Sequence, residues 1–487
     1  MTESRVTHLD WFWLLTIAVL SFFVSAPPFY PFLNSDIAVH VLMSHDFSFQ
    51  NDMYYWSQDR LGSFVPMVAY LIKALSGFPA VWAVSVVKWL LLVFGAACFW
   101  YFMPLRLFRW AFSVLWFFPI YELRFLLLPG HPYGEQLAFL ALSFICFDRA
   151  VLRSRFWFFP AFIASAVISI WISDFSLFFF LLLSLFYSKP LLRFLYSFFS
   201  WNHRIKILAS TIISLLGLVL LLYAKLHSVR DPSYTLQMFA SLDQFLHSLD
   251  LLWFYTRNVI FFQSISFWNS FAFFSAFGLS FLFLVNYRSL GGWQAYFLLS
   301  FLLGFTFISS LRWLSINYVM LKYFIPTFYA LWAGFCAISP ALFSRYKIIL
   351  STLLIILSLS SVFSLLHVYS LYVQDQDPVC ISLDDVQTIE HSHKRFFIGE
   401  YWHSYVLSIA HPDEVVSTPH DRDFLRHNAP VLATLRSDTI ILVANNWLNT
   451  VPDSIVQYNH LLVSTGNVWK EGKFEFAEFL NVGKANH

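Results

Sequence analysis

Apolar runs of about 18 or more residues recur along the chain as far as residue 371, and short polar connections separate them. A run of this length can cross the hydrocarbon core of a bilayer as a single helix. The fold class predicted from this pattern is an all-α polytopic membrane protein with about eleven transmembrane helices. These spans are expected at 11–29, 79–102, 110–128, 135–150, 156–172, 174–188, 207–226, 260–285, 293–311, 322–340 and 348–371.

The pattern changes at residue 374. From there to residue 487, short apolar runs such as TIILV alternate with polar helical stretches and with turns rich in Asn, Pro and Gly. Such alternation is typical of a small α/β domain outside the membrane. We therefore divide the chain into a membrane domain, 1–373, and a C-terminal α/β domain, 374–487.

Two connections are long enough to hold structure of their own. The first, 30–78, is expected to carry two helices on the membrane surface, the second of them at 64–76, where Gly77 and Pro79 end it. The other connection, 227–258, has apolar residues at helical spacing and is expected to cover the site as a lid.

Composition supports the membrane assignment and excludes some classes of function. The chain is 59% hydrophobic and 12% charged, whereas a soluble globular domain carries about 25% charged residues. A net charge of +2 gives no support for nucleic acid as a partner. The four cysteines form no spacing that predicts a disulfide framework or a zinc site.

The distribution of lysine and arginine predicts the orientation. Alternate connections are rich in these cations, and such connections face the cytoplasm. The cation-rich set holds Arg5, Arg106, Arg109, Arg149, Arg153, Arg155, Lys189, Arg193, Arg204, Lys206, Arg288, Arg345 and Lys347. The loop 30–78, the turn at His131, the loop 227–258 and the C-terminal domain are then extracytoplasmic.

The acidic residues agree with this orientation. Of the eleven between Trp11 and Leu371, ten are expected in or near the outer face and only Asp148 at a cytoplasmic end. Acids are costly in lipid and tend to mark a functional, hydrated region. The ten are Asp36, Asp46, Asp52, Asp59, Glu122, Glu135, Asp174, Asp231, Asp243 and Asp250.

Four of these acids lie in the stretch 34–64, together with an aromatic run at 54–56. Asp36 is our candidate for a general base, with Asp52 and Asp59 as alternatives. Asp36 could instead cap the helix that follows it, although Ser35 could serve equally well. Asp36 and His40 share a helix face, so a divalent metal ion remains a weak alternative, and no cofactor is firmly predicted.

Several cations flank the same face. Lys322 and Arg312 lie on either side of the outer start of the span 322–340, where a cation suits a phosphate group or simply reaches the interface. Arg60 either pairs with Asp59 or meets a phosphate, and Arg257 is a weaker candidate. Lys88 falls in the middle of a span without an evident partner.

Four short motifs occur in order on the predicted outer side: YYWSQDRLGS at 54–63, HPYGE at 131–135, WISD at 171–174 and LKYFIP at 321–326. With the acid after the first span, they resemble the bacterial branch of the GT-C membrane glycosyltransferases, which includes the protein O-mannosyltransferases and the lipid A aminoarabinose transferase. The resemblance covers about residues 10–340.

The resemblance implies a polyprenyl-phosphate-linked sugar as donor, a glycan, lipid or protein as acceptor, and a bacterial inner membrane as location. It implies Asp36 as the catalytic acid of the first outer loop and Lys322 in place of the usual Arg of the late motif. The side chains that it implies for binding sugar or acceptor are Tyr54, Tyr55, Trp56, Gln58, His131, Glu135, Asp174 and Tyr323.

The chain departs from the family pattern at two points. Ser57 stands where a glycine is common, and Asp36 stands alone where some members have an acidic pair, which puts metal dependence in doubt. Two rival functions remain on the sequence alone. One is a carrier or flippase for lipid-linked sugars, which needs no base, and the other is an O-antigen ligase or polymerase, whose polar loop would fall late in the chain.

Overall fold

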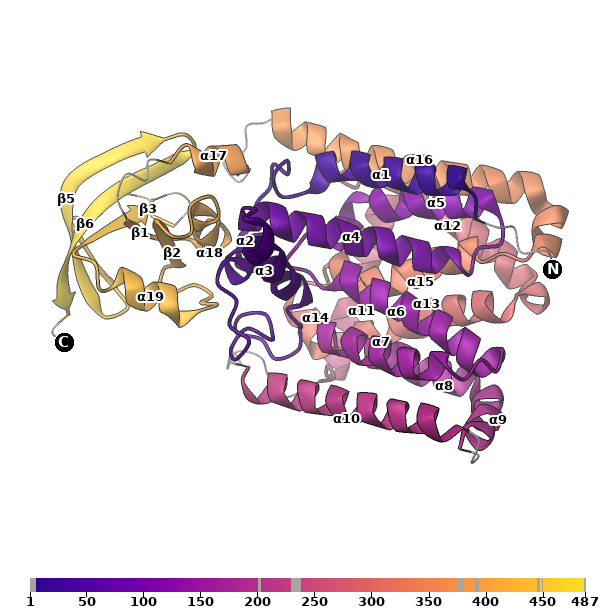
Figure 1. Cartoon of the computed structure of the whole chain (residues 1–487). Helices are drawn as coiled ribbons and strands as arrows, with labels where there is room; N and C mark the ends of the chain where they lie inside the picture. The colour runs from indigo at the N-terminus through magenta and orange to yellow at the C-terminus, as the bar shows by residue number, and fades with distance from the viewer. Residues whose placement is uncertain are drawn as a thin grey trace.

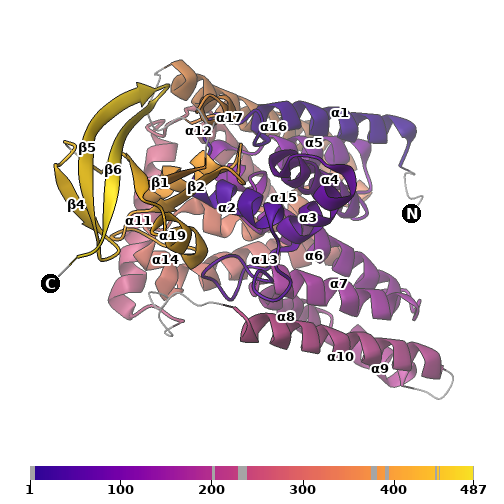
Figure 2. The same ribbon diagram turned by 60° about the vertical axis from the view of Figure 1, so that its left-hand side comes forward.

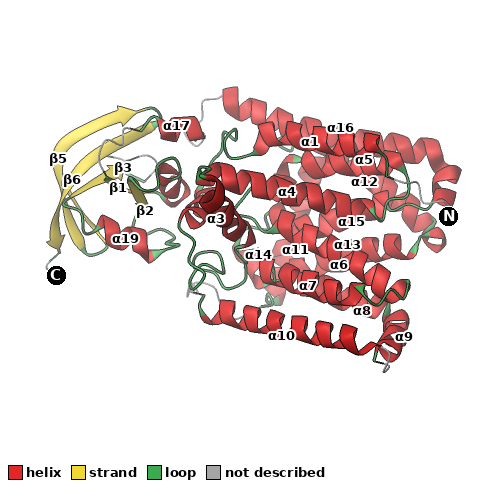
Figure 3. Ribbon diagram, viewed as in Figure 1, coloured by secondary structure: helices red, strands yellow, loops and turns green. Residues whose placement is uncertain are grey.

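A computed structural model describes residues 6–199, 203–228, 238–374, 381–389, 394–444, 447–448 and 450–485. Most of the chain is a bundle of helices that lie side by side, and a β-sheet stands at one end of it (Figures 1 and 3). The sheet belongs to the last hundred residues, so the predicted combination of a helical membrane protein with a C-terminal α/β region is confirmed.

Six described helices are long and apolar enough to cross a membrane: α1 (His8–Ser25), α4 (Ala80–Trp100), α10 (Arg204–Leu226), α12 (Trp268–Val285), α13 (Gly292–Ser309) and α16 (Pro340–Gln374). The pair α8 (Ser176–Phe186) and α9 (Ser188–Phe198), bent by 87°, would make a seventh. The protein is thus a multi-pass membrane protein.

Each of the eleven predicted spans contains a helix. Outside the bent pair α8 and α9, the shorter ones are α5 (Arg106–Phe117), α6 (Tyr133–Phe147), α7 (Phe158–Ile172) and α15 (Ile325–Cys336). At 12 to 15 residues, these helices fall short of the roughly 20 that a full crossing needs. The number eleven therefore stays a prediction.

The bundle is apolar on the outside and closely packed inside. On α10, Leu216 is 63% exposed, as expected of a side chain that faces lipid tails. On its inner side, a Cβ on Gly217 would lie 2.7 Å from Val167 of α7. Because lipid provides no hydrophobic drive between helices, small residues that permit close approach hold such interfaces together.

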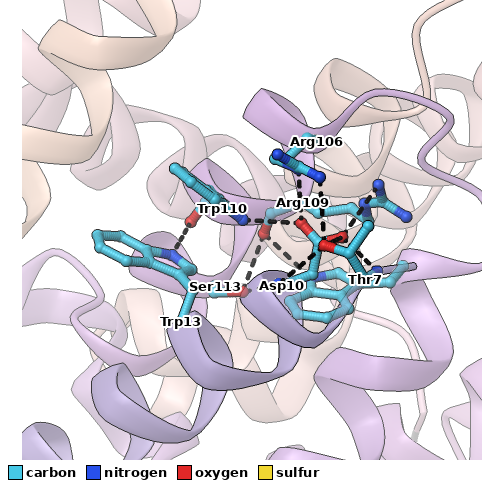
Figure 4. A network of polar contacts seen from close by, with 8 residues as sticks. Thr7, Asp10, Trp13, Arg106, Arg109, Trp110 and Ser113 are labelled. Atoms are coloured by element: carbon cyan, nitrogen blue, oxygen red, sulfur yellow. Dashed lines mark hydrogen bonds and ion pairs between the residues drawn. The ribbon is translucent and has the colours of Figure 1, made fainter. Parts of the chain in front are cut away.

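The end of the bundle opposite the sheet is fixed by a buried ionic network (Figure 4). Asp10 on α1 pairs with Arg106 at 3.3 Å and Arg109 at 3.4 Å, and accepts a hydrogen bond from Trp110 at 3.0 Å. Thr7 caps the same helix. The network joins α1 to α5 with two cations of the set that we predicted to be cytoplasmic.

At the sheet end, the first long connection folds into α2 (Ser35–His45) and α3 (Phe64–Ser76), as predicted. Between them the chain is tied to the loop after α7, because the amide of Gly62 donates to the carbonyl of Ile172 at 3.1 Å. A Cβ on Gly62 would lie 2.5 Å from the carbonyl oxygen of Trp171, so glycine is required there. The second long connection contains α11 (Leu242–Ile260), whereas residues 229–237, with Asp231, lie outside the described residues.

The C-terminal region is a six-stranded sheet in the order β2-β1-β3-β6-β5-β4. Strands β1, β2 and β3 are parallel, and the rest pair antiparallel. The strands are β1 (Arg395–Gly399), β2 (Val415–Pro419), β3 (Thr439–Val443), β4 (Ser454–Gln457), β5 (His460–Glu471) and β6 (Phe474–Lys484). The parallel part faces the bundle, and Figure 2 shows β1 and β2 on the side of α2. The segments α18 (Tyr401–Ser404) and η6 (Tyr405–Ser408) pack against α2.

Candidate functional site

Asp36 lies in the first turn of α2, between the helical bundle and the C-terminal sheet. Its carboxylate does not cap the helix, since the side chain of Asn34 accepts from the amide of Ile37 at 3.1 Å. The alternative that Asp36 or Ser35 is the cap is therefore wrong. Ser35 donates its hydroxyl to the carbonyl of Tyr401 instead. Asp36 is left free for interactions with other side chains.

All polar contacts of the Asp36 carboxylate fall on one oxygen. Oδ1 accepts from the hydroxyl of Tyr401 at 2.8 Å and from that of Tyr55 at 3.3 Å, and Nη2 of Arg426 lies 3.9 Å away. Within the described part of the chain, Oδ2 has no hydrogen bond or ion pair. The side chain is 14% exposed. One carboxylate oxygen is held and the other is available to a substrate.

Two of these partners come from the C-terminal sheet region and were missed in the sequence. Tyr401 follows the end of β1, and Arg426 lies in the segment after β2. These strands are parallel neighbours, and ligand-facing residues of α/β sheets gather beyond the carboxyl ends of such strands. That placement is the signal by which a sequence reading could have found them.

Burial opposes ionisation of Asp36, but the nearby cations Arg426 and Lys322 and the hydrogen bond from Tyr401 hold its pKa below the ordinary value. Burial and the charge of Lys322 in turn keep the pKa of His131 well below its usual range. His131 is therefore neutral at neutral pH, and the cations that keep Asp36 ionised are Arg426 and Lys322.

His40 supports the backbone beside Asp36. Its Nδ1 accepts from the amide of Gly130 at 2.9 Å, and burial with the charge of Lys88 lowers the pKa of His40 to about 3. The neutral ring then carries its proton on Nε2, so neither nitrogen offers a lone pair to a metal ion. Asp36 and His40 do not fit a metal site, and no group of three His, Cys, Asp or Glu among the described residues could hold a metal.

The partner of the mid-span Lys88 is Glu135, at 2.5 Å between Nζ and Oε2. Lys88 also donates to the carbonyl of His131 at 3.0 Å. Both charged side chains are almost fully buried, so this pair fixes α4 to the start of α6 underneath the site. The carboxylate of Glu135, which we predicted to bind sugar or acceptor, is engaged by Lys88.

Of the two alternative acids, Asp52 has both carboxylate oxygens engaged within its own loop. Asp52 accepts from the amide of Ser48 at 2.8 Å with Oδ2 and from Nε1 of Trp56 at 2.9 Å with Oδ1. Burial raises its pKa. Asp59 accepts a hydrogen bond from Lys225 through its backbone carbonyl. Asp52 thus shapes the loop with both of its oxygens, whereas Asp36 keeps one oxygen open.

Asp174 also meets Lys225, at 3.1 Å. Helix α8 begins two residues later, and its N-cap, Phe175, makes no side-chain capping bond. Asp174 could also have served as the N-cap of the span predicted at 174–188, and the structure shows that it does not. Burial raises the pKa of Asp174. Its carboxylate joins the loop after α7 to the end of α10.

Of the four cations predicted to bind phosphate, Lys322 and Arg60 lie against aromatic rings close to one another. Lys322, in η5 (Leu321–Phe324), lies close enough to Asp36 to influence its ionisation. Its Nζ is 5.0 Å from the ring centre of Phe125 and 5.3 Å from that of Tyr323. Arg60 lies 4.9 Å from the ring of Trp313, which in turn packs on Tyr323 at 4.0 Å. Aromatic faces thus surround both cations.

The other two predicted cations have different neighbours. The amide of Arg312, at the start of α14 (Arg312–Ile316), donates to the carbonyl of Met238 at 3.1 Å. The guanidinium of Arg257 lies 5.7 Å from the ring of Phe254 on the same helix. The structure does not bring Arg257 into contact with Asp36 or Lys322.

The three aromatic side chains of the run 54–56 contact three different parts of the molecule. Tyr55 donates to Asp36, whereas Trp56 stacks on His427 of the C-terminal region with 4.5 Å between ring centres. Tyr54 is buried, and Nζ of Lys225 lies 5.2 Å from its ring centre. Gln58 is buried with Oε1 lacking a hydrogen-bond partner in the described structure.

The backbone explains the departure at Ser57. Its φ is +59°, in the left-handed region that favours glycine. The serine has a use of its own here, since Nη1 of Arg426 donates to its hydroxyl at 3.3 Å. This contact links the loop to the C-terminal region beside Asp36.

No family model matches the chain, and no curated protein matches it in sequence. Solved structures are similar to it. ArnT from Cupriavidus metallidurans in the apo state aligns with a TM-score of 0.45 and 10% identity over 97% of this chain and 98% of that one. The same protein bound to undecaprenyl phosphate aligns with a TM-score of 0.42 and 11% identity, over 98% and 99%.

The arabinosyltransferase EmbB from Mycobacterium smegmatis aligns over 76% of this chain with a TM-score of 0.40 and 12% identity. This chain spans 38% of the length of EmbB. These likenesses concern the course of the chain and not its chemistry.

Proposed function

We propose that this protein is a membrane glycosyltransferase of GT-C type that moves a sugar from a polyprenyl-phosphate-linked donor to a hydroxyl of a cell-envelope glycan, lipid or protein. The observation that carries the proposal is the Asp36 carboxylate, which is held ionised with Oδ1 fixed and Oδ2 open. The four outer motifs found in the sequence support the same assignment. The enzyme would reside in a bacterial inner membrane with its site and C-terminal domain on the outer face.

In the proposed reaction, the acceptor oxygen attacks the anomeric carbon while its proton passes to Oδ2 of Asp36. The new carbon–oxygen bond forms as the bond to the lipid phosphate breaks, and the phosphate leaves with the electron pair. A carboxylate that stays ionised is suited to receive the proton. Inversion at the sugar carbon follows from the family resemblance.

The lipid phosphate gains negative charge as it leaves, so a fixed cation nearby lowers the barrier. Of the predicted phosphate ligands, Lys322 is the one whose charge acts on the ionisation of Asp36. Arg60 lies over Trp313, which packs on Tyr323 beside Lys322. A base and a phosphate cation thus meet at the sheet end of the bundle. A carrier for lipid-linked sugars would use the cation but would need no base.

The decisive experiment compares wild type with Asp36→Asn for transfer from a panel of radiolabelled polyprenyl-phosphate sugars, and for binding of the same donors. We expect Asp36→Asn to retain donor binding and to lose roughly a hundredfold or more in rate, the range of general base catalysis. Asp46→Asn is the matched control, because Asp46 is an exposed acid at the other end of α2.

Two outcomes would count against the proposal. If donors bind but no sugar reaches any acceptor, the carrier function is favoured. If Asp36→Asn transfers as fast as wild type while Asp52→Asn or Asp59→Asn does not, the base has been assigned to the wrong carboxylate.

A further inference from the structure

We infer that Tyr401, backed by Arg426, is a positioning residue through which the C-terminal domain sets the orientation of the catalytic carboxylate. The inference rests on the proposed function of Asp36. It assigns a task in the reaction to a domain that carries no recognisable sugar or lipid motif.

Tyr401 is held by hydrogen bonds to its backbone and to its hydroxyl. Its amide donates to Oδ2 of Asp423 at 2.7 Å, and its carbonyl accepts from the hydroxyl of Ser35. The residue is 1% exposed. Because Ser35 directly precedes Asp36, Tyr401 contacts two neighbouring side chains in the first turn of α2, Ser35 through its backbone carbonyl and Asp36 through its hydroxyl.

The direction of the hydrogen bonds is determined by chemistry. Nε of Arg426 lies 2.9 Å from the hydroxyl of Tyr401, and a guanidinium can only donate. The tyrosine oxygen therefore accepts from Arg426, and its single proton is left for Oδ1 of Asp36, 2.8 Å away. The three groups form a chain in which each donates to the next, from Arg426 through Tyr401 to Asp36.

Arg426 is positioned by both parts of the molecule. Its amide donates to the hydroxyl of Tyr405 at 3.1 Å, and Nη1 donates to Ser57 in the outer loop. Its guanidinium lies 5.6 Å from the ring centre of Tyr55 and 5.3 Å from that of Tyr401. The cation thus sits between the two tyrosines that hold Oδ1.

This arrangement has two consequences for a base. Fixing Oδ1 holds Oδ2 in the orientation that faces the acceptor, so the reaction does not have to restrict the rotation of the carboxylate at an entropic cost. Donation to Oδ1 also favours the ionised form. Burial and the charge of Asp36 raise the pKa of Tyr401 well above its ordinary value, so the hydroxyl stays protonated and able to donate.

The test is a double-mutant cycle of Tyr401→Phe with Asp36→Asn, measured as kcat and donor binding. A hydrogen bond to a charged group predicts that Tyr401→Phe lowers kcat about tenfold to a hundredfold in the wild-type background, with donor binding unchanged. In the Asp36→Asn background it should have little further effect, because the residues act as one unit.

The matched control is Tyr458→Phe. It removes a partly buried tyrosine hydroxyl from the same domain, where it donates to the carbonyl of Pro419 at 2.7 Å, and leaves Asp36 untouched. Arg426→Gln is the second variant, because it keeps the ring of Tyr401 in place and is expected to lower kcat in the same way.

The pH profile provides a readout that a purely structural role would not change. Removing the donor from Oδ1 disfavours the ionised carboxylate, so the acidic limb of kcat/KM should move to higher pH in Tyr401→Phe and in Arg426→Gln. The groups that face Asp36 and contribute to this limb are Tyr55, Tyr401, Arg426, His131, Lys322 and His40.

Three results would overturn the inference. If Asp36→Asn is slow and both Tyr401→Phe and Arg426→Gln match wild type, positioning fails and the proposed function stands. If Tyr401→Phe slows both backgrounds equally, the tyrosine acts on the fold and not through Asp36. If Asp36→Asn is as fast as wild type, the proposed base fails, and the positioning role with it.

Discussion

His40 is buried in α2, one turn from Asp36, in its neutral form, and this makes α2 sensitive to acid. Its pKa is about 3 in the folded protein against 6.5 for the free side chain. Between these values the unfolded chain binds the extra proton, so stability falls as the pH drops below about 6.5, by up to about 1.4 kcal/mol per pH unit.

We therefore predict that Tm in detergent falls between about pH 7 and pH 5 and that His40→Asn, which keeps an acceptor for the amide of Gly130, reduces this dependence, because the buried His131 contributes the same dependence in both proteins. Asp36 does not contribute in this window, because its pKa lies below the ordinary 3.8 and its stabilisation is lost only below that value. His45→Asn, on the same helix with an exposed partner in Asp413, should keep the dependence of wild type. An unchanged slope in His40→Asn would contradict the prediction.

At the scale of elements, the position of α2 depends on a close approach of the turn before α6. A Cβ on Gly130 would lie 2.2 Å from the carbonyl oxygen of Asp36, and its φ is +87°. Gly130→Ala must displace the first turn of α2, so we predict a loss of about 3 kcal/mol or more in unfolding free energy, together with loss of transfer activity.

Gly77→Ala is the matched control for this substitution. Gly77 ends α3 with a φ of +72°, and a Cβ there would meet nothing within 4 Å. Only backbone strain of about 1 kcal/mol is expected, with full activity. Equal losses of Tm and activity in the two variants would show that the contact with Asp36 has no special role.

At the scale of the whole molecule, the proposed orientation places the sheet and the cation-rich connections on opposite sides of the membrane. Ser454 in β4 and Ser344 near the start of α16 are exposed sites at these two places. We predict that Ser454→Cys reacts with an impermeant maleimide in spheroplasts, whereas Ser344→Cys reacts only after permeabilisation.

The background for labelling is Cys380→Ser, since Cys98, Cys146 and Cys336 are buried. If Ser344→Cys were labelled in sealed spheroplasts and Ser454→Cys were not, the proposed orientation would be wrong, and Asp36 would lie on the cytoplasmic side.

The sequence was sufficient for those features that depend on local composition. Runs of apolar residues must be buried in lipid or protein, so the positions of the helices followed from hydropathy, and α3 was predicted to the residue because Gly77 ends it. The alternation after residue 374 predicted a sheet for the same reason. Asp36 could be singled out because an acid beside a membrane span is costly unless it has a use.

The partners of these residues were decided by the tertiary structure alone. Hydropathy does not encode which end of the sheet meets α2, so Tyr401 and Arg426, some 365 and 390 positions from Asp36, carried only the signal that they follow strands, and nothing that tied them to Asp36. The same holds for Lys88 and Glu135, whose pairing needs two helices to pack side by side. Charge in a buried site is stabilised by whatever the fold brings near it, and this neighbourhood is a property of three dimensions.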